Sequence, residues 1–135
     1  MNRTFLWSLA LLLFTAGCGG GRPTSDYVPK GDQAKVALTL ALDAWKSGGQ
    51  PDPAGKLPSG QTVKAVDMDW SGGQKLSSYE IVRELPAEES APRKIVVKLS
   101  HPSGESLEAT YFIVGIDPVQ VFRDKDYQRY FDASK

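Results

Sequence analysis

The two residue types most often used in nucleophilic and acid–base catalysis are each present once in this 135-residue chain, as His101 and Cys18. A serine or cysteine nucleophile needs a base beside it, and His101 stands directly before Pro102, where a solvated strand end is expected. The sequence has neither a Gly-x-Ser-x-Gly elbow nor a glycine-rich phosphate loop. It therefore predicts no catalytic residue and no cofactor, and it favours a non-enzymatic role.

Asp67 and Asp69 are the best-spaced pair of potential metal ligands. They alternate with Val66, Met68 and Trp70, which predicts a strand with both carboxylates on one face. Such a pair could hold Ca²⁺ if further oxygen ligands converged on it. Nothing else in the sequence converges there, so we expect a solvated strand face and no metal site.

Arg83 is the one charged residue that falls in phase with an apolar strand face, formed by Tyr79, Ile81 and Leu85. A buried unpaired guanidinium is costly, so Arg83 is expected either at a sheet edge with its head in water or in a cleft with an anion. The candidate ligand-binding residues for such a cleft are Arg83, Trp45, Trp70 and Tyr111, because aromatic walls with one fixed charge suit a small acidic ligand. The alternative is that these aromatic residues only fill the core.

The N-terminal residues have the three parts of a secretory signal peptide. Arg3 supplies a basic start, residues 5–14 form an apolar run, and small residues follow at positions 15–17. The run is shorter than the roughly 20 apolar residues of a membrane-spanning helix. Residues 1–17 are therefore predicted to be a signal peptide.

The stretch Phe14-Thr15-Ala16-Gly17-Cys18 resembles the lipobox of bacterial lipoproteins, with Thr15 where leucine is commonest. The resemblance implies that Cys18 is lipidated and becomes the first residue of the mature protein, anchored in a membrane of the cell envelope. Two or three acyl chains would hold it firmly. By the same resemblance, Gly19 favours the outer membrane, because some bacteria read aspartate at that position as a retention signal for the inner membrane.

Behind the anchor, residues 18–31 are rich in Gly, Pro, Ser and Thr and are predicted to form a flexible tether. A buried strand through Tyr27-Val28 is the alternative. Residues 32–135 are then one small domain. It is expected to begin with a helix capped by Asp32 and ended by Gly48-Gly49, with one apolar face. That face consists of Ala34, Ala37, Leu38, Ala41, Leu42 and Trp45.

Alternating apolar residues after Gly60 predict strands at residues 66–70, 79–85, 95–99 and 107–113, with a short fifth at 119–121. The turn Pro102-Ser103-Gly104-Glu105 predicts a hairpin between the third and fourth. Residues 124–135 are expected to be a closing helix or a frayed tail. The predicted fold class is α+β, with one N-terminal helix packed on a four- to five-stranded antiparallel meander.

This order of elements is similar to that of cystatin-like and nuclear-transport-factor-2-like domains. The cystatin inhibitory loop is matched poorly, because Ala65 replaces its glycine. With 16 basic and 16 acidic residues, the chain has no excess charge for nucleic acid. The predicted function is a membrane-anchored, non-enzymatic envelope lipoprotein that contacts another protein or a surface polymer. The alternative is a nuclear-transport-factor-2-like domain whose pocket binds a small molecule or acts on it as an enzyme.

Overall fold

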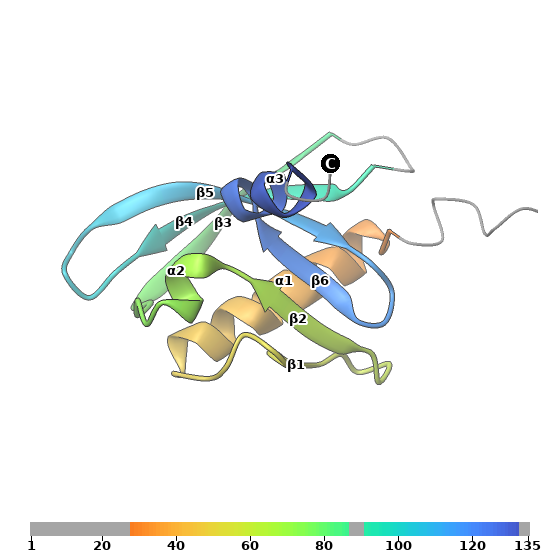
Figure 1. The fold of residues 1–135 in the computed structure, drawn as a ribbon, viewed down its shortest axis with the longest axis horizontal. Coiled ribbons are helices and arrows are strands. Elements are labelled where there is room, and N and C mark those ends of the chain that lie inside the picture. The colour runs from red at the N-terminus through yellow and green to blue at the C-terminus, as the bar shows by residue number, and fades with distance from the viewer. Residues whose placement is uncertain (1–27, 87–90, 133–135) are drawn as a thin grey trace, which may run out of the picture.

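The computed structural model describes residues 28–86 and 91–132, which form an α+β domain with six strands (Figure 1). The predicted signal peptide and Cys18 lie outside the described residues. In chain order the elements are α1 (Gly31–Lys46), β1 (Gly55–Lys56), β2 (Thr62–Val66), α2 (Met68–Ser71), β3 (Ser78–Leu85), β4 (Arg93–Ser100), β5 (Ser106–Val114), β6 (Val119–Arg123) and α3 (Asp124–Asp132). None of the helices in residues 28–86 and 91–132 is both long and apolar enough to cross a bilayer.

Helix α1 forms where the apolar periodicity predicts it. It starts at Gly31, after Lys30, so Asp32 lies in the first turn and not at the cap. There its negative carboxylate lies near the positive end of the helix dipole, which stabilises the helix. The helix ends at Lys46 with Ser47 as its C-cap, and Gly48 follows with φ of 82°, a backbone conformation that favours glycine.

The sheet is mixed, which corrects the predicted antiparallel meander. Its strand order is β1-β2-β6-β5-β4-β3. Strands β3 to β6 do run as an antiparallel meander, but β6 pairs with β2 in parallel. Alternation of apolar residues predicts a strand but not its partner, so it could not predict the pairing of β2 with β6, which are far apart along the chain. Strand β1 has two residues, which is too short to give an alternating pattern.

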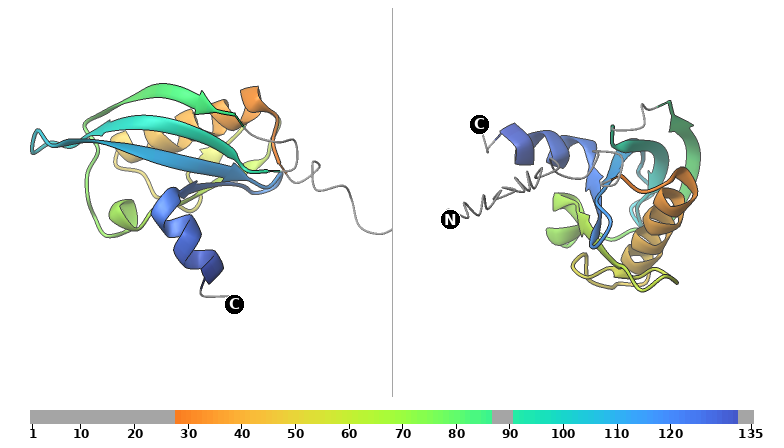
Figure 2. Two further views of the ribbon diagram at one scale, coloured as in Figure 1. Left: turned by 90° about the horizontal axis from the view of Figure 1, so that it is seen from above. Right: turned by 90° about the vertical axis from the view of Figure 1, so that its right-hand side faces the viewer.

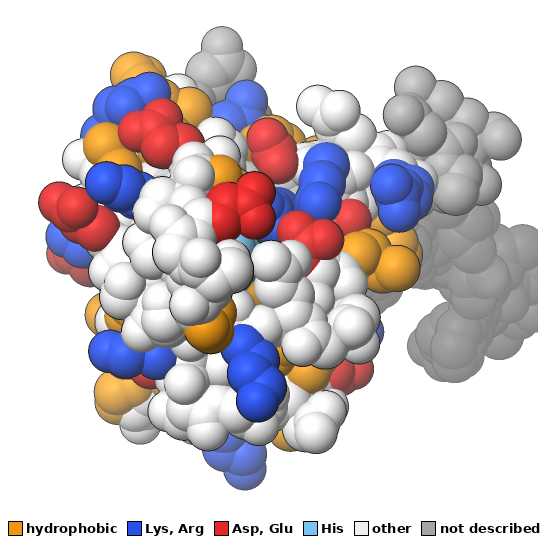
Figure 3. All heavy atoms as spheres, turned by 90° about the vertical axis from the view of Figure 1, so that its left-hand side faces the viewer, with side chains coloured by type: hydrophobic (Ala, Val, Ile, Leu, Met, Phe, Trp, Pro, Cys, Tyr) orange, Lys and Arg blue, Asp and Glu red, His pale blue; other side chains and the backbone are white. Residues whose placement is uncertain are grey.

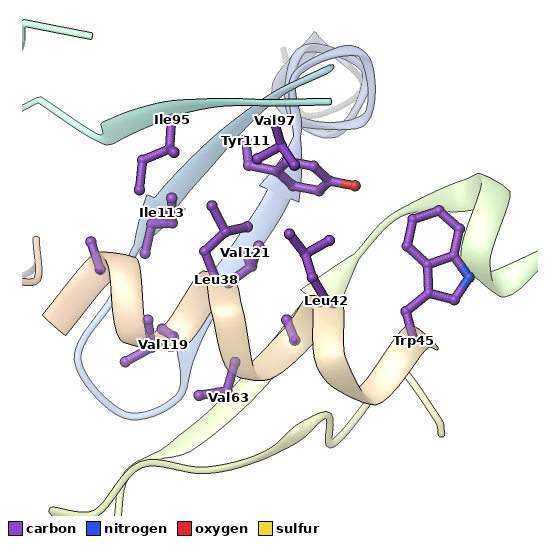
Figure 4. Packing of buried hydrophobic residues seen from close by; sticks show 14 of the residues in the cluster. Leu38, Leu42, Trp45, Val63, Ile95, Val97, Tyr111, Ile113, Val119 and Val121 are labelled. Carbon is purple, nitrogen blue, oxygen red and sulfur yellow. The ribbon is translucent and has the colours of Figure 1, made fainter. Parts of the chain in front are cut away.

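The sheet curls around α1, so the core lies between the helix and the inner face of the strands (Figures 1 and 2). Figure 4 shows Leu38 and Leu42 pointing from the helix toward Val97, Tyr111 and Val121 on the strands. Further buried members of this cluster are Ala34, Ala37, Ala41, Trp45, Leu57, Val63, Ala65, Trp70, Leu76, Ile95, Leu99, Ala109, Ile113 and Val119. The predicted packing of helix on sheet is therefore confirmed.

The outer face of the sheet is covered at β5 and β6 by α3. Tyr127 lies with its ring 4.6 Å from that of Phe112 and 5.5 Å from that of Phe122, centre to centre. Residues 124–132 thus form a packed helix, and Oδ2 of buried Asp126 on α3 accepts a hydrogen bond of 3.0 Å from the backbone amide of Met68 at the start of α2.

The predicted first strand ends earlier than the alternation suggests. Strand β2 stops at Val66, and Met68–Ser71 is a short helix, α2. The Asp67 carboxylate accepts hydrogen bonds from the backbone amides of Asp69 and Trp70, as an N-cap residue does. The prediction of a strand through Met68 and Trp70 is therefore wrong, because capping by Asp67 turns the chain into a helix.

The last residues of the predicted tether pack against the domain. Pro29 is buried, and its carbonyl accepts a hydrogen bond of 3.3 Å from Nε of Arg93 on β4. The chain is thus fixed to the sheet before α1 begins.

Candidate ligand-binding cleft

Arg83 does not lie with the other residues of the predicted cleft. A β-bulge falls between Ile81 and Arg83, so that Ile81 is opposite Val97 but Arg83 is opposite Val96. The extra residue, Val82, moves Arg83 out of phase with the inner face of the sheet. The side chain of Arg83 is exposed. Of the two positions expected for Arg83, the structure shows the sheet edge, because β3 is an edge strand and the Arg83 side chain is exposed; the alternative position in a cleft beside the aromatic residues is not found.

Tyr111 points inward from β5 but is also not part of an open cleft. Its side chain is buried, and its hydroxyl donates a hydrogen bond of 2.8 Å to Oδ2 of Asp67. Burial and the neighbouring charge of Asp67 raise the pKa of Tyr111 well above its ordinary value. The residue is a buried link between β5 and α2.

Trp45 and Trp70 do come together, as the predicted site requires. Their rings stack with centres 5.6 Å apart and planes within 13° of parallel. Trp45 Nε1 donates to the carbonyl of Gln74 at 2.7 Å, and Trp70 Nε1 donates to the carbonyl of Gly49 at 3.1 Å. Each indole is therefore bonded to the loop that follows the other tryptophan.

Both of these loops have the same sequence, Ser-Gly-Gly-Gln, at residues 47–50 and 71–74. The first follows α1 and the second begins with the last residue of α2. Each loop contains a glycine with positive φ, 82° at Gly48 and 95° at Gly73. The repeat is visible in the sequence, one copy shortly after each tryptophan, and it was the available signal for this site.

An open cleft of about 430 Å³ lies between the two loops, within the usual size range of small-molecule sites. Its lining is mainly uncharged: Trp45, Gly48, Gly49, Gln50, Pro51, Trp70, Ser71, Gly73, Gln74 and Lys75. The tryptophan rings are almost completely covered, at 3% and 7% exposure, so ligand would meet only the rim of Trp70. Figure 3 shows the end of the molecule where α1 and α2 end, and uncharged groups make up much of the middle of this face.

The polar side chains at the mouth of the cleft are free to meet a ligand. Gln50, Ser71, Gln74 and Lys75 are all exposed, and none of their side chains is hydrogen-bonded to another residue of the described chain. Lys75 is the one ionisable residue among those lining the cleft.

His101 is buried behind the wall of the cleft, which corrects the expectation of a solvated residue. It is 3% exposed, its Nδ1 lies 2.8 Å from the carbonyl of Lys75, and its ring centre is 6.0 Å from that of Trp45. Nε2 is buried without a hydrogen-bond partner among the described residues. His101 thus holds the loop at Lys75 from inside and does not line the cleft.

Asp67 and Asp69 form ion pairs and are not a solvated strand face. Arg123 on β6, itself buried, contacts Asp69 and lies 3.6 Å from Asp67, while Lys125 lies 3.0 Å from Asp69. Burial raises the pKa of Asp69, but the hydrogen bond from Lys125 and the charges of Arg123 and Lys125 outweigh it, so the pKa is lowered. Within the described ranges, no three His, Cys, Asp or Glu residues are arranged to hold a metal ion.

The cleft has the chemistry of a binding site. Beside Lys75, its lining offers amide, hydroxyl and backbone groups, which can hold a polar ligand by hydrogen bonds.

Comparisons with protein-family models, with curated proteins and with solved structures find no match to this chain.

Proposed function

We propose that this chain is a lipid-anchored, non-enzymatic binding protein of the bacterial cell envelope, and that its domain binds a ligand in the cleft between the two Ser-Gly-Gly-Gln loops. The observation that carries the binding role is the lining of that cleft, which offers uncharged hydrogen-bonding groups and a single ionisable residue, Lys75. Trp45 and Trp70 hold the two loops in place.

The anchor is supported by the sequence of residues 1–18. The basic start, the short apolar run and the small residues before Cys18 have the order of a lipoprotein signal. Acyl chains on Cys18 would hold the domain at a membrane, with the outer membrane favoured.

Labelling with a radioactive fatty acid in a diderm bacterium tests the anchor. The parent chain is expected to carry label and to fractionate with the membranes, while a Cys18→Ala variant carries none. Ser47→Ala, which leaves residues 1–18 unchanged, is the matched control and should be labelled like the parent. Equal labelling of the Cys18→Ala variant, or no label in the parent, contradicts the anchor.

Binding in the cleft is tested by nuclear magnetic resonance on the ¹⁵N-labelled, detergent-solubilised protein. The probes are a panel of monosaccharides, short oligosaccharides, amino acids, dipeptides and nucleosides. We expect at least one probe to shift the indole signals of Trp45 and Trp70 and the backbone signals of both loops. Ser71→Trp should abolish the shifts by filling the cleft, whereas Lys35→Trp, on the exposed side of α1, should leave them unchanged. No shift in the cleft with any probe would contradict the binding role.

A further inference from the structure

We infer that the ligand of this cleft is a neutral saccharide that carries an acetamido group, an inference that rests on the proposed binding function. The first argument is the charge of the lining. Lys75 is the one charged side chain there, so a phosphorylated or strongly anionic ligand would find a single counter-charge, and a cation would find no carboxylate. A neutral ligand matches this surface.

The second argument is the hydrogen-bonding capacity of the free side chains. The amides of Gln50 and Gln74 each provide an acceptor oxygen and two donor hydrogens, and the Ser71 hydroxyl both donates and accepts. Sugar hydroxyls have the same dual capacity. An acetamido group offers one N–H donor and one carbonyl acceptor on opposite sides of its trans amide. One glutamine can therefore accept from its N–H while the other donates to its carbonyl.

The third argument is the shape and rigidity of the two loops. They face each other across the cleft and each supplies one glutamine, Gln50 or Gln74, so both sides of a ring can be held. Because the indole N–H of each tryptophan is bonded to the opposite loop, the loops are ordered before ligand arrives, which lowers the entropic cost of binding. Pro51 and the rim of Trp70 add a small apolar surface for the C–H groups of a ring or the acetamido methyl.

An extended peptide fits this site less well. Peptides are commonly held by main-chain hydrogen bonds along a strand edge, and no strand borders the cleft. The carbonyls of Gly49 and Gln74, which could have served a peptide main chain, already accept the indole N–H groups.

The test is a titration of the full, detergent-solubilised protein followed by nuclear magnetic resonance, with N,N′-diacetylchitobiose as probe. Cellobiose has the same ring linkage without acetamido groups and is the matched ligand control. We expect N,N′-diacetylchitobiose to shift the side-chain amide signals of Gln50 and Gln74 and to bind about tenfold more tightly than cellobiose, as the loss of one good hydrogen bond predicts.

Variants locate the binding and separate the two proposals. Gln74→Leu and Gln50→Leu should each weaken binding of N,N′-diacetylchitobiose about tenfold, whereas Gln128→Leu, at an exposed position on α3, should leave it unchanged. Equal affinity for the two disaccharides overturns the acetamido assignment. Binding of only an amino acid, dipeptide or nucleoside in the cleft overturns the saccharide inference and leaves the proposed binding function standing. Absence of any ligand from the cleft overturns both.

Discussion

The hydroxyl of Tyr111 and the carboxylate of Asp67 are joined by a buried hydrogen bond of 2.8 Å that connects the middle of the sheet to the start of α2. The other oxygen of the same carboxylate caps α2 and faces Arg123. Asp67 thus links β5, α2 and β6, and α2 carries the tryptophan that forms the floor of the cleft. The first three predictions concern this buried cluster.

Replacing Arg123 by methionine should destabilise the protein strongly. Asp67, at 1% exposure, would lose its nearest positive charge, and a buried charge without its partner costs about 3–5 kcal/mol of unfolding free energy. Urea denaturation measures the change. Lys125→Met is the matched control, because Lys125 is half exposed and its pair with Asp69 is worth at most about 1 kcal/mol. Similar losses in the two variants would contradict this account of Arg123.

Replacing Tyr111 by phenylalanine should cost about 1–3 kcal/mol at neutral pH, because Oδ2 of Asp67 loses its donor. It should also change stability in alkali. The pKa of Tyr111 is raised in the folded protein, so its contribution is complete below the ordinary value of 10.0 and is lost as pH rises further, when the unfolded chain ionises first.

Urea denaturation in a series of alkaline buffers measures this effect. The parent should lose stability above pH 10 more steeply than Tyr111→Phe does. The pKa of Tyr79 is also raised, by burial and by its hydrogen bond to Asp43. Tyr79→Phe should therefore also reduce the decrease in unfolding free energy with rising pH, independently of Tyr111. Identical slopes in the parent and Tyr111→Phe would be inconsistent with a buried, protonated hydroxyl.

Replacing Asp69 by asparagine should lower stability at neutral pH and have less effect in acid. The pKa of Asp69 is lowered in the folded state, so its ionised form stabilises the protein above the ordinary value of 3.8, and this contribution is lost as pH falls below that value through the folded pKa. The difference in unfolding free energy between parent and variant should therefore shrink below pH 3.8. Glu105→Gln, at an exposed position in the turn between β4 and β5, is the control; a gap that widens in acid would contradict the prediction.

Replacing Gly115 by alanine should be more damaging than replacing Gly60 by alanine. Both glycines have positive φ, 84° and 93°, so each substitution carries backbone strain of about 1–2 kcal/mol. A Cβ at Gly115 would also lie 2.6 Å from the carbonyl oxygen of Pro118, whereas one at Gly60 would meet open space. Thermal denaturation should show the larger loss for Gly115→Ala, and equal losses would show that the turn before β6 relaxes freely.

Local sequence signals predicted those parts of the fold that local physics decides. The apolar stripe and Gly48-Gly49 predicted α1, and Pro102 to Glu105 predicted the β4–β5 hairpin, both of which are confirmed. The parallel pairing of β2 with β6 was missed because it joins segments that are distant along the chain, where alternation carries no information about partners.

The site was predicted in part. Trp45 and Trp70 were named correctly as neighbours, because large aromatic residues from the helix and the following segment had to share one core. For Arg83 the sequence left a sheet edge and a cleft open, and the structure shows the edge; the cleft was offered because a bulge changes the phase of a strand without changing its composition. Asp67 was misplaced because an aspartate can equally alternate in a strand or cap a helix.

The pairing of β2 with β6 sets the order in which the molecule can assemble. Val63 and Ala65 find their strand neighbours, Val119 and Val121, only when the chain has been completed as far as Arg123. Contacts so distant along the chain form late and slowly. Strand β2 therefore has no β6 to pair with until residues 119–123 have been made, so the sheet stays open on that side for most of the synthesis of the described domain.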